Sequence, residues 1–116
     1  MSLVLFLSLI WIQTFSSLQT VEEFSVLMEK DYTLVDVRTP EEYINGSLPN
    51  ALNISVTALN FPLEINRLNK EKPILIFCKS GARSARAALA MKALGFKQIY
   101  ELDGGYMAWK AAGLID

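Results

Sequence analysis

Four short, mainly apolar runs recur along the chain, each bounded by polar or turn-forming residues. Short apolar runs between turn signals are typical of strands that are buried in a sheet. We therefore expect strands at residues 33–37, 51–54, 74–77 and 98–102.

Signals for helices fall before and between these runs. Thr20 and Glu23, and again Thr39 and Glu42, have the spacing of a capping box, in which each side chain bonds the backbone N–H of the other residue. We expect helices from the first box to about residue 29 or 30, from the second box through residue 43, and at 63–68, 83–94 and 106–111.

The alternation of strands and helices indicates an α/β fold with a central, mostly parallel sheet and helices on both faces. A chain of 116 residues without linkers or repeats suits a single domain. In such sheets, ligands bind beyond the carboxyl ends of the strands. Residues 36–38 end one predicted strand and Cys78 ends another, so both are expected at this edge.

The first residues form a separate apolar segment. Residues 3–12 have the length of a signal-peptide core and are too few for an ordinary membrane-spanning helix. Residues 14–16 resemble a cleavage site, although no lysine or arginine precedes the apolar run. We therefore divide the chain into an apolar leader, 1–16, and a domain, 17–116.

The role of the leader decides where the protein is expected. A cleaved signal peptide implies export, for example to a periplasm, whereas a retained leader implies membrane contact through an anchor. The alternative is an N-terminal strand or helix that packs on the domain or on a neighbouring copy, in a cytoplasmic protein.

Composition excludes several kinds of chemistry. Eleven basic and twelve acidic residues nearly cancel, so no net field favours nucleic acid as a partner. A single cysteine rules out an internal disulfide and a cysteine-cluster metal site. The lack of histidine removes Cys-His and Ser-His-Asp mechanisms and most zinc chemistry. We expect no metal and no cofactor.

The strongest chemical signal is Cys78, which ends a predicted buried strand. A turn containing Gly81 follows, and a helix-forming stretch begins directly after the turn. A thiol at this position faces backbone N–H groups and the positive end of a helix, and Lys79 and Arg83 add positive charge nearby. These effects favour the thiolate, so we expect a lowered pKa and a nucleophilic role. The alternative is an inert cysteine that fills the core.

Four stretches of the chain, within residues 17–115, resemble the single-domain rhodanese (thiosulfate sulfurtransferase) family. They are residues 36–43, 46–54, 78–84 and 102–109, and they occur in the order that the family shows. The third has the family's Cys-x-x-Gly-x-Arg-Ser pattern and the fourth its Gly-Gly-x-x-x-Trp pattern. Ser47, Leu48 and Asn50 stand where the family usually has His, Ile and Gly.

The resemblance implies that Cys78 accepts sulfur from a small donor such as thiosulfate, forms a persulfide and passes the sulfur to cyanide or a protein thiol. It implies that backbone amides form a substrate-binding cradle, contributed by Lys79, Ser80, Gly81, Ala82 and Arg83. It assigns supporting roles to Asp36, Arg38, Glu42 and Ser84. We also expect Arg38 to pair with Glu42.

Two other functions remain open from the sequence. A persulfide carrier or a non-catalytic interaction module would have the same fold without turning over small molecules. A cysteine phosphatase or arsenate reductase is less well supported, because four residues separate Cys78 from Arg83, whereas the protein-phosphatase pattern has five. Phe77 also stands where such enzymes commonly have histidine.

Overall fold

The computed structural model of the chain describes residues 15–114. Residues 1–14 of the predicted leader lie outside the described residues. Among the residues that are described, no helix is both long enough and apolar enough to cross a membrane.

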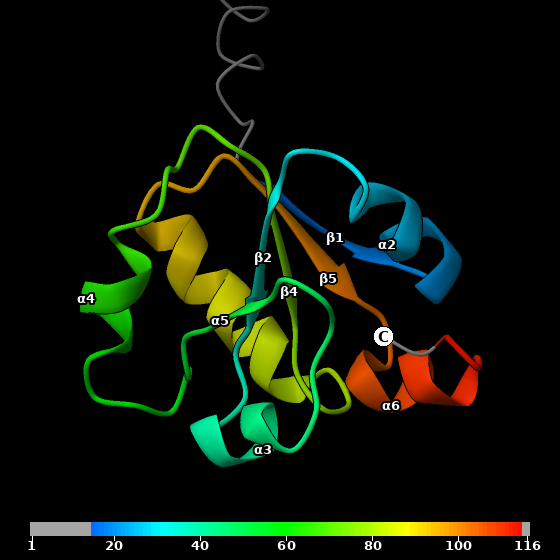
Figure 1. Cartoon of the computed structure of the whole chain (residues 1–116). Helices are drawn as coiled ribbons and strands as arrows, with labels where there is room; N and C mark the ends of the chain where they lie inside the picture. The colour runs from blue at the N-terminus through cyan, green and yellow to red at the C-terminus, as the bar shows by residue number, and fades with distance from the viewer. Residues whose placement is uncertain (1–14, 115–116) are drawn as a thin grey trace, which may run out of the picture.

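The described residues form five strands and five helices, shown in Figure 1. The strands are β1 (Phe15–Gln19), β2 (Thr33–Asp36), β3 (Leu52–Asn53), β4 (Ile74–Phe77) and β5 (Gln98–Leu102). The helices are α2 (Val21–Leu27), α3 (Pro40–Ile44), α4 (Phe61–Ile65), α5 (Ala82–Ala93) and α6 (Gly105–Ala111).

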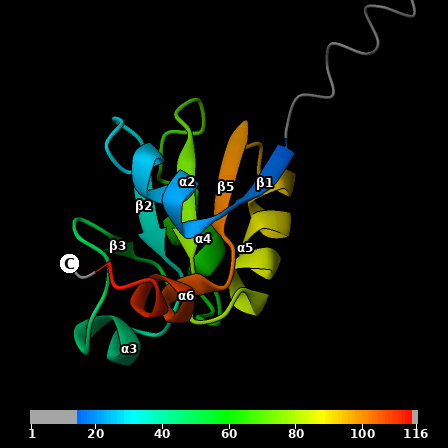
Figure 2. The same ribbon diagram turned by 90° about the vertical axis from the view of Figure 1, so that its right-hand side faces the viewer.

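The strands form one sheet in the order β1-β5-β4-β2-β3, and every neighbouring pair is parallel. Figure 2 shows β1 at one edge and β3 at the other. Because all strands run the same way, their carboxyl ends meet at a single edge. The expected α/β fold with a mostly parallel sheet is confirmed.

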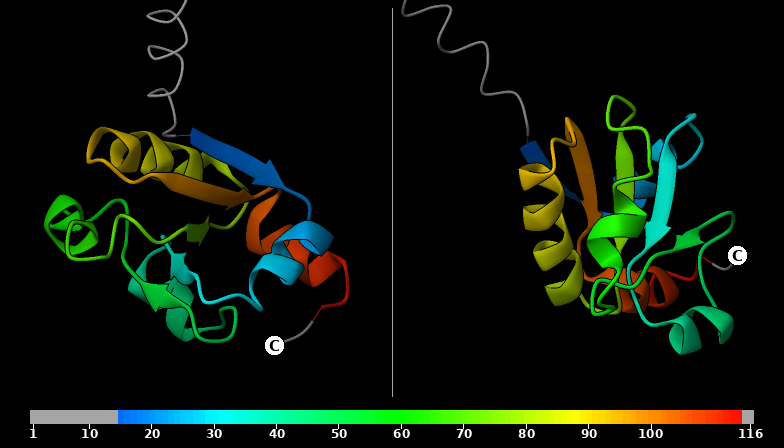
Figure 3. Two further views of the ribbon diagram at one scale, coloured as in Figure 1. Left: turned by 90° about the horizontal axis from the view of Figure 1, so that it is seen from above. Right: turned by 90° about the vertical axis from the view of Figure 1, so that its left-hand side faces the viewer.

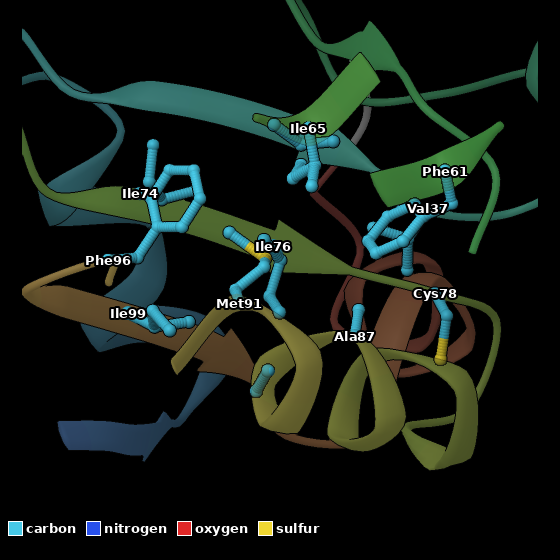
Figure 4. Packing of buried hydrophobic residues seen from close by; sticks show 12 residues of the cluster. Val37, Phe61, Ile65, Ile74, Ile76, Cys78, Ala87, Met91, Phe96 and Ile99 are labelled. Carbon is cyan, nitrogen blue, oxygen red and sulfur yellow. The ribbon is translucent and has the colours of Figure 1, made fainter. Parts of the chain in front are cut away.

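Successive side chains of β4 point to opposite faces of the sheet, so they pack against different helices. Ile74 and Ile76 belong to the buried cluster that α4 and α5 cover. Leu75 and Phe77 belong to the cluster that α2 and α6 cover. Figure 3 shows the two layers on opposite sides of the sheet. Cys78 belongs to the same cluster as Ile74 and Ile76, and in Figure 4 its side chain lies beside α5.

Strand β1 was not among the predicted strands. It pairs with β5 along its whole length, from Phe15 opposite Gln98 to Gln19 opposite Leu102. The strand therefore extends two residues into the segment 1–16 that we had separated from the domain. An N-terminal strand packed on the domain was the alternative to a leader at this end of the chain.

Two helices also differ from their predicted limits by more than one residue. Helix α2 ends earlier than predicted, because the N–H of Glu29 bonds the carbonyl of Val26, three residues back, and tightens the last turn. Helix α4 begins and ends earlier than the predicted 63–68. Pro62 lies in its first turn, where a missing N–H costs no helical hydrogen bond.

Candidate active site

Cys78 follows β4 at the carboxyl edge of the sheet and is almost completely buried, with 1% of its surface exposed. The backbone N–H of Gly81 donates a hydrogen bond to Sγ at 3.0 Å. The hydroxyl of Ser84, in the first turn of α5, lies 3.6 Å from Sγ. The chain therefore turns around the sulfur between the end of β4 and the start of α5.

The surroundings of Cys78 shift the pKa of its thiol. Burial acts to raise the pKa, but the contact with the Ser84 hydroxyl and the hydrogen bonds from the backbone N–H groups of Ser84, Gly81 and Ser80 lower it below its ordinary value. The net direction is the one that the sequence predicted. The main source of the shift is hydrogen bonding, whereas the sequence interpretation had also stressed the charges of Lys79 and Arg83.

Gly81 makes the turn possible. Its φ of +123° lies in a region that side-chain-bearing residues rarely adopt, and it precedes the first residue of α5. The other four residues of the predicted cradle flank Gly81 in the chain. Of these, Lys79, Ser80 and Ala82 are exposed, and Arg83 is half-buried.

The N-terminus of α6 forms hydrogen bonds with the start of the loop that follows β4. The N–H of Tyr106 donates to the carbonyl of Cys78 at 2.8 Å, and the N–H of Met107 donates to the carbonyl of Lys79 at 3.0 Å. A Cβ on Gly105 would lie 2.6 Å from the carbonyl oxygens of Cys78 and Lys79, so only glycine fits there. These bonds hold the carbonyls of Cys78 and Lys79 away from the sulfur. The N–H groups of the next residues, Ser80 and Gly81, can therefore face Sγ. The sequence marked Gly105 as a family feature, but its spacing gave no indication of this contact.

Arg83 and Glu42 form a bidentate ion pair across the mouth of the loop. Nη1 of Arg83 lies 2.7 Å from Oε1 of Glu42, and Nη2 lies 2.9 Å from Oε2. The hydrogen bonds from Arg83 lower the pKa of Glu42 to about 2. The predicted pairing of Arg38 with Glu42 is therefore wrong.

Arg38 pairs with Asp36 instead, because both residues point to the same side of the chain that continues β2. Its Nη2 lies 2.7 Å from Oδ2 of Asp36, and the same nitrogen donates to the carbonyl of Gly46 at 2.7 Å. The guanidinium also lies over the ring of Tyr106, with Cζ 4.5 Å from the ring centroid. Both members of the pair are buried, so they support the fold beside the loop and are not free to meet a substrate.

Ser47 joins this network at the position where the family usually has histidine. Its hydroxyl donates to Oδ2 of Asp36 at 2.8 Å. The substitution thus keeps a hydrogen-bond donor that ties the segment after α3 to the end of β2. Within residues 15–114, no group of three or more histidine, cysteine, aspartate or glutamate side chains could hold a metal ion.

Comparisons with known proteins agree with this geometry. A family model described as a rhodanese-like domain matches residues 20–112. A sulfurtransferase of Allochromatium vinosum is 35% identical over 85 residues, which cover 73% of this chain and 78% of that protein. The thiosulfate sulfurtransferase GlpE of Coxiella burnetii is 32% identical over 97 residues, which cover 84% of this chain and 89% of that protein.

Solved structures show the same fold. The crystal structure of a rhodanese-related protein from Thermoplasma volcanium matches with a TM-score of 0.72 and 31% identity, over 85% of this chain and 94% of that one. The similarity therefore spans almost all the described residues, and the named relatives support sulfurtransferase activity in general. The chain belongs to the rhodanese-like domain family.

Proposed function

We propose that the protein is a sulfurtransferase that carries sulfane sulfur on Cys78, with thiosulfate or a related compound as the donor. The thiolate attacks the outer sulfur of thiosulfate, the S–S bond of the donor breaks, and sulfite leaves with the electron pair. The resulting persulfide then gives its outer sulfur to a thiophile such as cyanide or a protein thiol, and the Cys78 thiolate returns.

The observation that carries the proposal is the set of hydrogen-bond donors around Sγ. Neither half-reaction needs a general base if the thiol is already ionised, which suits a chain without histidine. The same N–H groups of Ser80, Gly81 and Ser84 would stabilise negative charge on the persulfide, as an oxyanion hole stabilises oxygen. The exposed ammonium of Lys79 would help to attract an anionic donor.

The ion pair of Arg83 argues against a phosphatase. In cysteine phosphatases the arginine of the loop must be free to bind the oxygens of a phosphoryl group. Here both terminal nitrogens of Arg83 bond the carboxylate of Glu42. A persulfide carrier remains the competing function, because an enzyme and a carrier would both load sulfur onto Cys78.

The test is intact-mass spectrometry of the wild type and of Cys78→Ser, before and after thiosulfate, followed by cyanide. We expect the wild type alone to gain the mass of one sulfur atom and to lose it to cyanide as thiocyanate. Repeated release of thiocyanate with excess thiosulfate indicates an enzyme, whereas one equivalent that is not renewed indicates a carrier. A wild type that never gains sulfur would contradict the proposal and favour an interaction module.

A further inference from the structure

A pocket of about 410 Å³ lies on the face of the sheet that α2 and α6 cover. Leu34 of β2 and Leu75 of β4 line it from the sheet, and Trp109 lines it from α6. Figure 3 shows α2 and α6 on the same side of the sheet. Cys78 belongs to the buried cluster on the other face. The pocket is therefore separate from the loop that surrounds the sulfur.

Trp109 brings a polar group without a partner to this pocket. The residue has only 6% of its surface exposed. Its indole N–H has no hydrogen-bond partner, and within residues 15–114 Nε1 is the only buried side-chain nitrogen or oxygen without one. Buried donors in folded proteins nearly always have an acceptor, because leaving one unpaired is unfavourable. Since Trp109 lines the pocket, a molecule bound there is in place to supply the missing acceptor.

The other side chains around the pocket favour a flat ring. Tyr32 lines it together with Trp109, so two aromatic rings are present. The ring of Tyr32 is stacked on that of Tyr100, with centroids 6.2 Å apart and an interplanar angle of 10°, which limits its movement. Met28 adds a flexible, polarisable thioether that can adapt to the edge of a ring. Aromatic ligands suit such a lining, because rings pack face to face with an offset or edge to face.

The charges at the pocket balance. Glu29 and Lys30 are the charged residues that line it, and both are exposed. One carboxylate and one ammonium group give no net charge that would select an anion or a cation. The buried part of the lining includes Leu34 and Leu75, which are apolar. The pocket is therefore suited to an uncharged molecule.

The size of the pocket completes the description of the ligand. About 410 Å³ falls within the range of roughly 300–1,000 Å³ that small-molecule sites have. We propose that this pocket binds an uncharged molecule with two fused rings, one of whose atoms accepts a hydrogen bond from Nε1 of Trp109. The acceptor is a carbonyl oxygen or a ring nitrogen. This site lies outside the sulfur chemistry, so it does not rest on the proposed sulfurtransferase function.

The test compares two probes that share a two-ring skeleton. 1-Tetralone carries a ketone oxygen, and tetralin has the same rings without the oxygen. Each is titrated into the full-length, ¹⁵N-labelled protein, and the indole N–H signals are followed by NMR. The chain has two tryptophans, and Trp11→Phe identifies the signal of Trp109.

We expect 1-tetralone to move the indole proton signal of Trp109 downfield and to saturate, with a Kd below about 1 mM. Tetralin should bind about fivefold more weakly, because it offers no acceptor. In Trp109→Phe, followed through the backbone amide signals of residues 28–32, the two probes should bind equally. Cys78→Ser should bind 1-tetralone as the wild type does, because the sulfur lies on the other face of the sheet.

A second variant fills the pocket without changing Trp109. Ser25 lines the pocket, and the hydrogen bond that its hydroxyl makes is internal to α2. Ser25→Phe should raise the Kd of 1-tetralone by at least about tenfold, because the new ring competes for the same space. Val26→Phe is the matched control, since Val26 is the next residue of α2, is 60% exposed and does not line the pocket. It should keep the Kd of the wild type.

Three results would overturn the proposal. The first is an indole signal of Trp109 that does not move up to the solubility limit of 1-tetralone. The second is equal affinity of the wild type for the two probes, which would show that no hydrogen bond to the ligand forms. The third is binding that Ser25→Phe and Val26→Phe weaken to the same extent, which would place the probe elsewhere on α2.

Discussion

Single residues explain how the pKa of a buried thiol is lowered. Cys78 lies in the same buried cluster as the isoleucines of β4, an environment that by itself disfavours charge. The donors around Sγ reverse this effect, and Ser84 is the one whose contribution comes from a side chain as well as from its backbone. In the structure the thiol donates to Oγ of Ser84, and the Ser84 hydroxyl donates to the carbonyl of Gly81 at 3.1 Å, so Ser84 connects the sulfur to the turn.

Ser84→Ala should therefore raise the pKa of Cys78. The rate at which iodoacetamide alkylates the native protein near neutral pH should fall about tenfold, the effect of losing one hydrogen bond to an ionised group. The rate is measured as a function of pH, and its midpoint should move upward. Ser25→Ala is a suitable control, because that hydroxyl bonds the carbonyl of Glu22 within α2. An unchanged pH profile in Ser84→Ala would show that the backbone amides lower the pKa of Cys78 without the Ser84 hydroxyl.

The ion pair of Glu42 makes stability depend on pH. Because the pKa of Glu42 is about 2 in the folded protein and 4.5 ordinarily, the carboxylate stabilises the fold above about pH 4.5. This stabilisation is lost as the pH falls from about 4.5 to about 2. Glu42→Gln should therefore reduce the free energy of unfolding by about 1–2 kcal/mol near pH 7, after allowance for solvent screening, and by much less near pH 2.

Urea denaturation at several pH values measures this difference. Glutamine at residue 42 still allows a capping box with Thr39, so the variant removes the ion pair and leaves the start of α3 intact. The neighbouring Glu41→Gln is the control, because Glu41 is exposed. A loss of stability in Glu42→Gln that does not change with pH would point to the cap and not to Arg83.

At the scale of elements, the active loop depends on a helix that comes much later in the chain. Helix α6 donates two N–H groups to the carbonyls of Cys78 and Lys79, and Gly105 allows its backbone to come close enough. Free N–H groups at the start of a helix have no partner within the helix, so these bonds also satisfy α6 itself. The loop and the helix therefore stabilise each other.

Gly105→Ala should disrupt this contact. The new Cβ would lie 2.6 Å from two carbonyl oxygens, and the residue would keep an unfavourable φ of +62°. We expect a loss of about 2–4 kcal/mol in the free energy of unfolding, together with slower alkylation of Cys78 in the native protein. Gly113→Ala is matched in backbone, with a φ of +79° and no atom within 4 Å of its Cβ, and should cost only about 1 kcal/mol. Equal losses in the two variants would show that the backbone conformation matters and the contact does not.

At the scale of the whole molecule, local patterns predicted the fold and the place of Cys78 at the carboxyl edge of the sheet, but not the long-range partners. The apolar runs at β2, β4 and β5 were visible because a strand buried on both faces needs such residues. β1 was missed because Ser16, Ser17 and Gln19 give an edge strand too little apolar character. Glu42 and its true partner are 41 residues apart, and spacing within one segment does not reveal such a pair.

The order of the strands has a consequence for the synthesis of the protein. β1 pairs only with β5 among the described strands, so the first of these strands to leave the ribosome waits for the last of them. The contacts from α6 to the loop come later still. A ribosome-bound nascent chain that stops before Gly105 would thus present Cys78 without those contacts. We expect Cys78 of such a chain to be alkylated more slowly than Cys78 of the finished protein, so its reactivity would develop only after α6 has been synthesised.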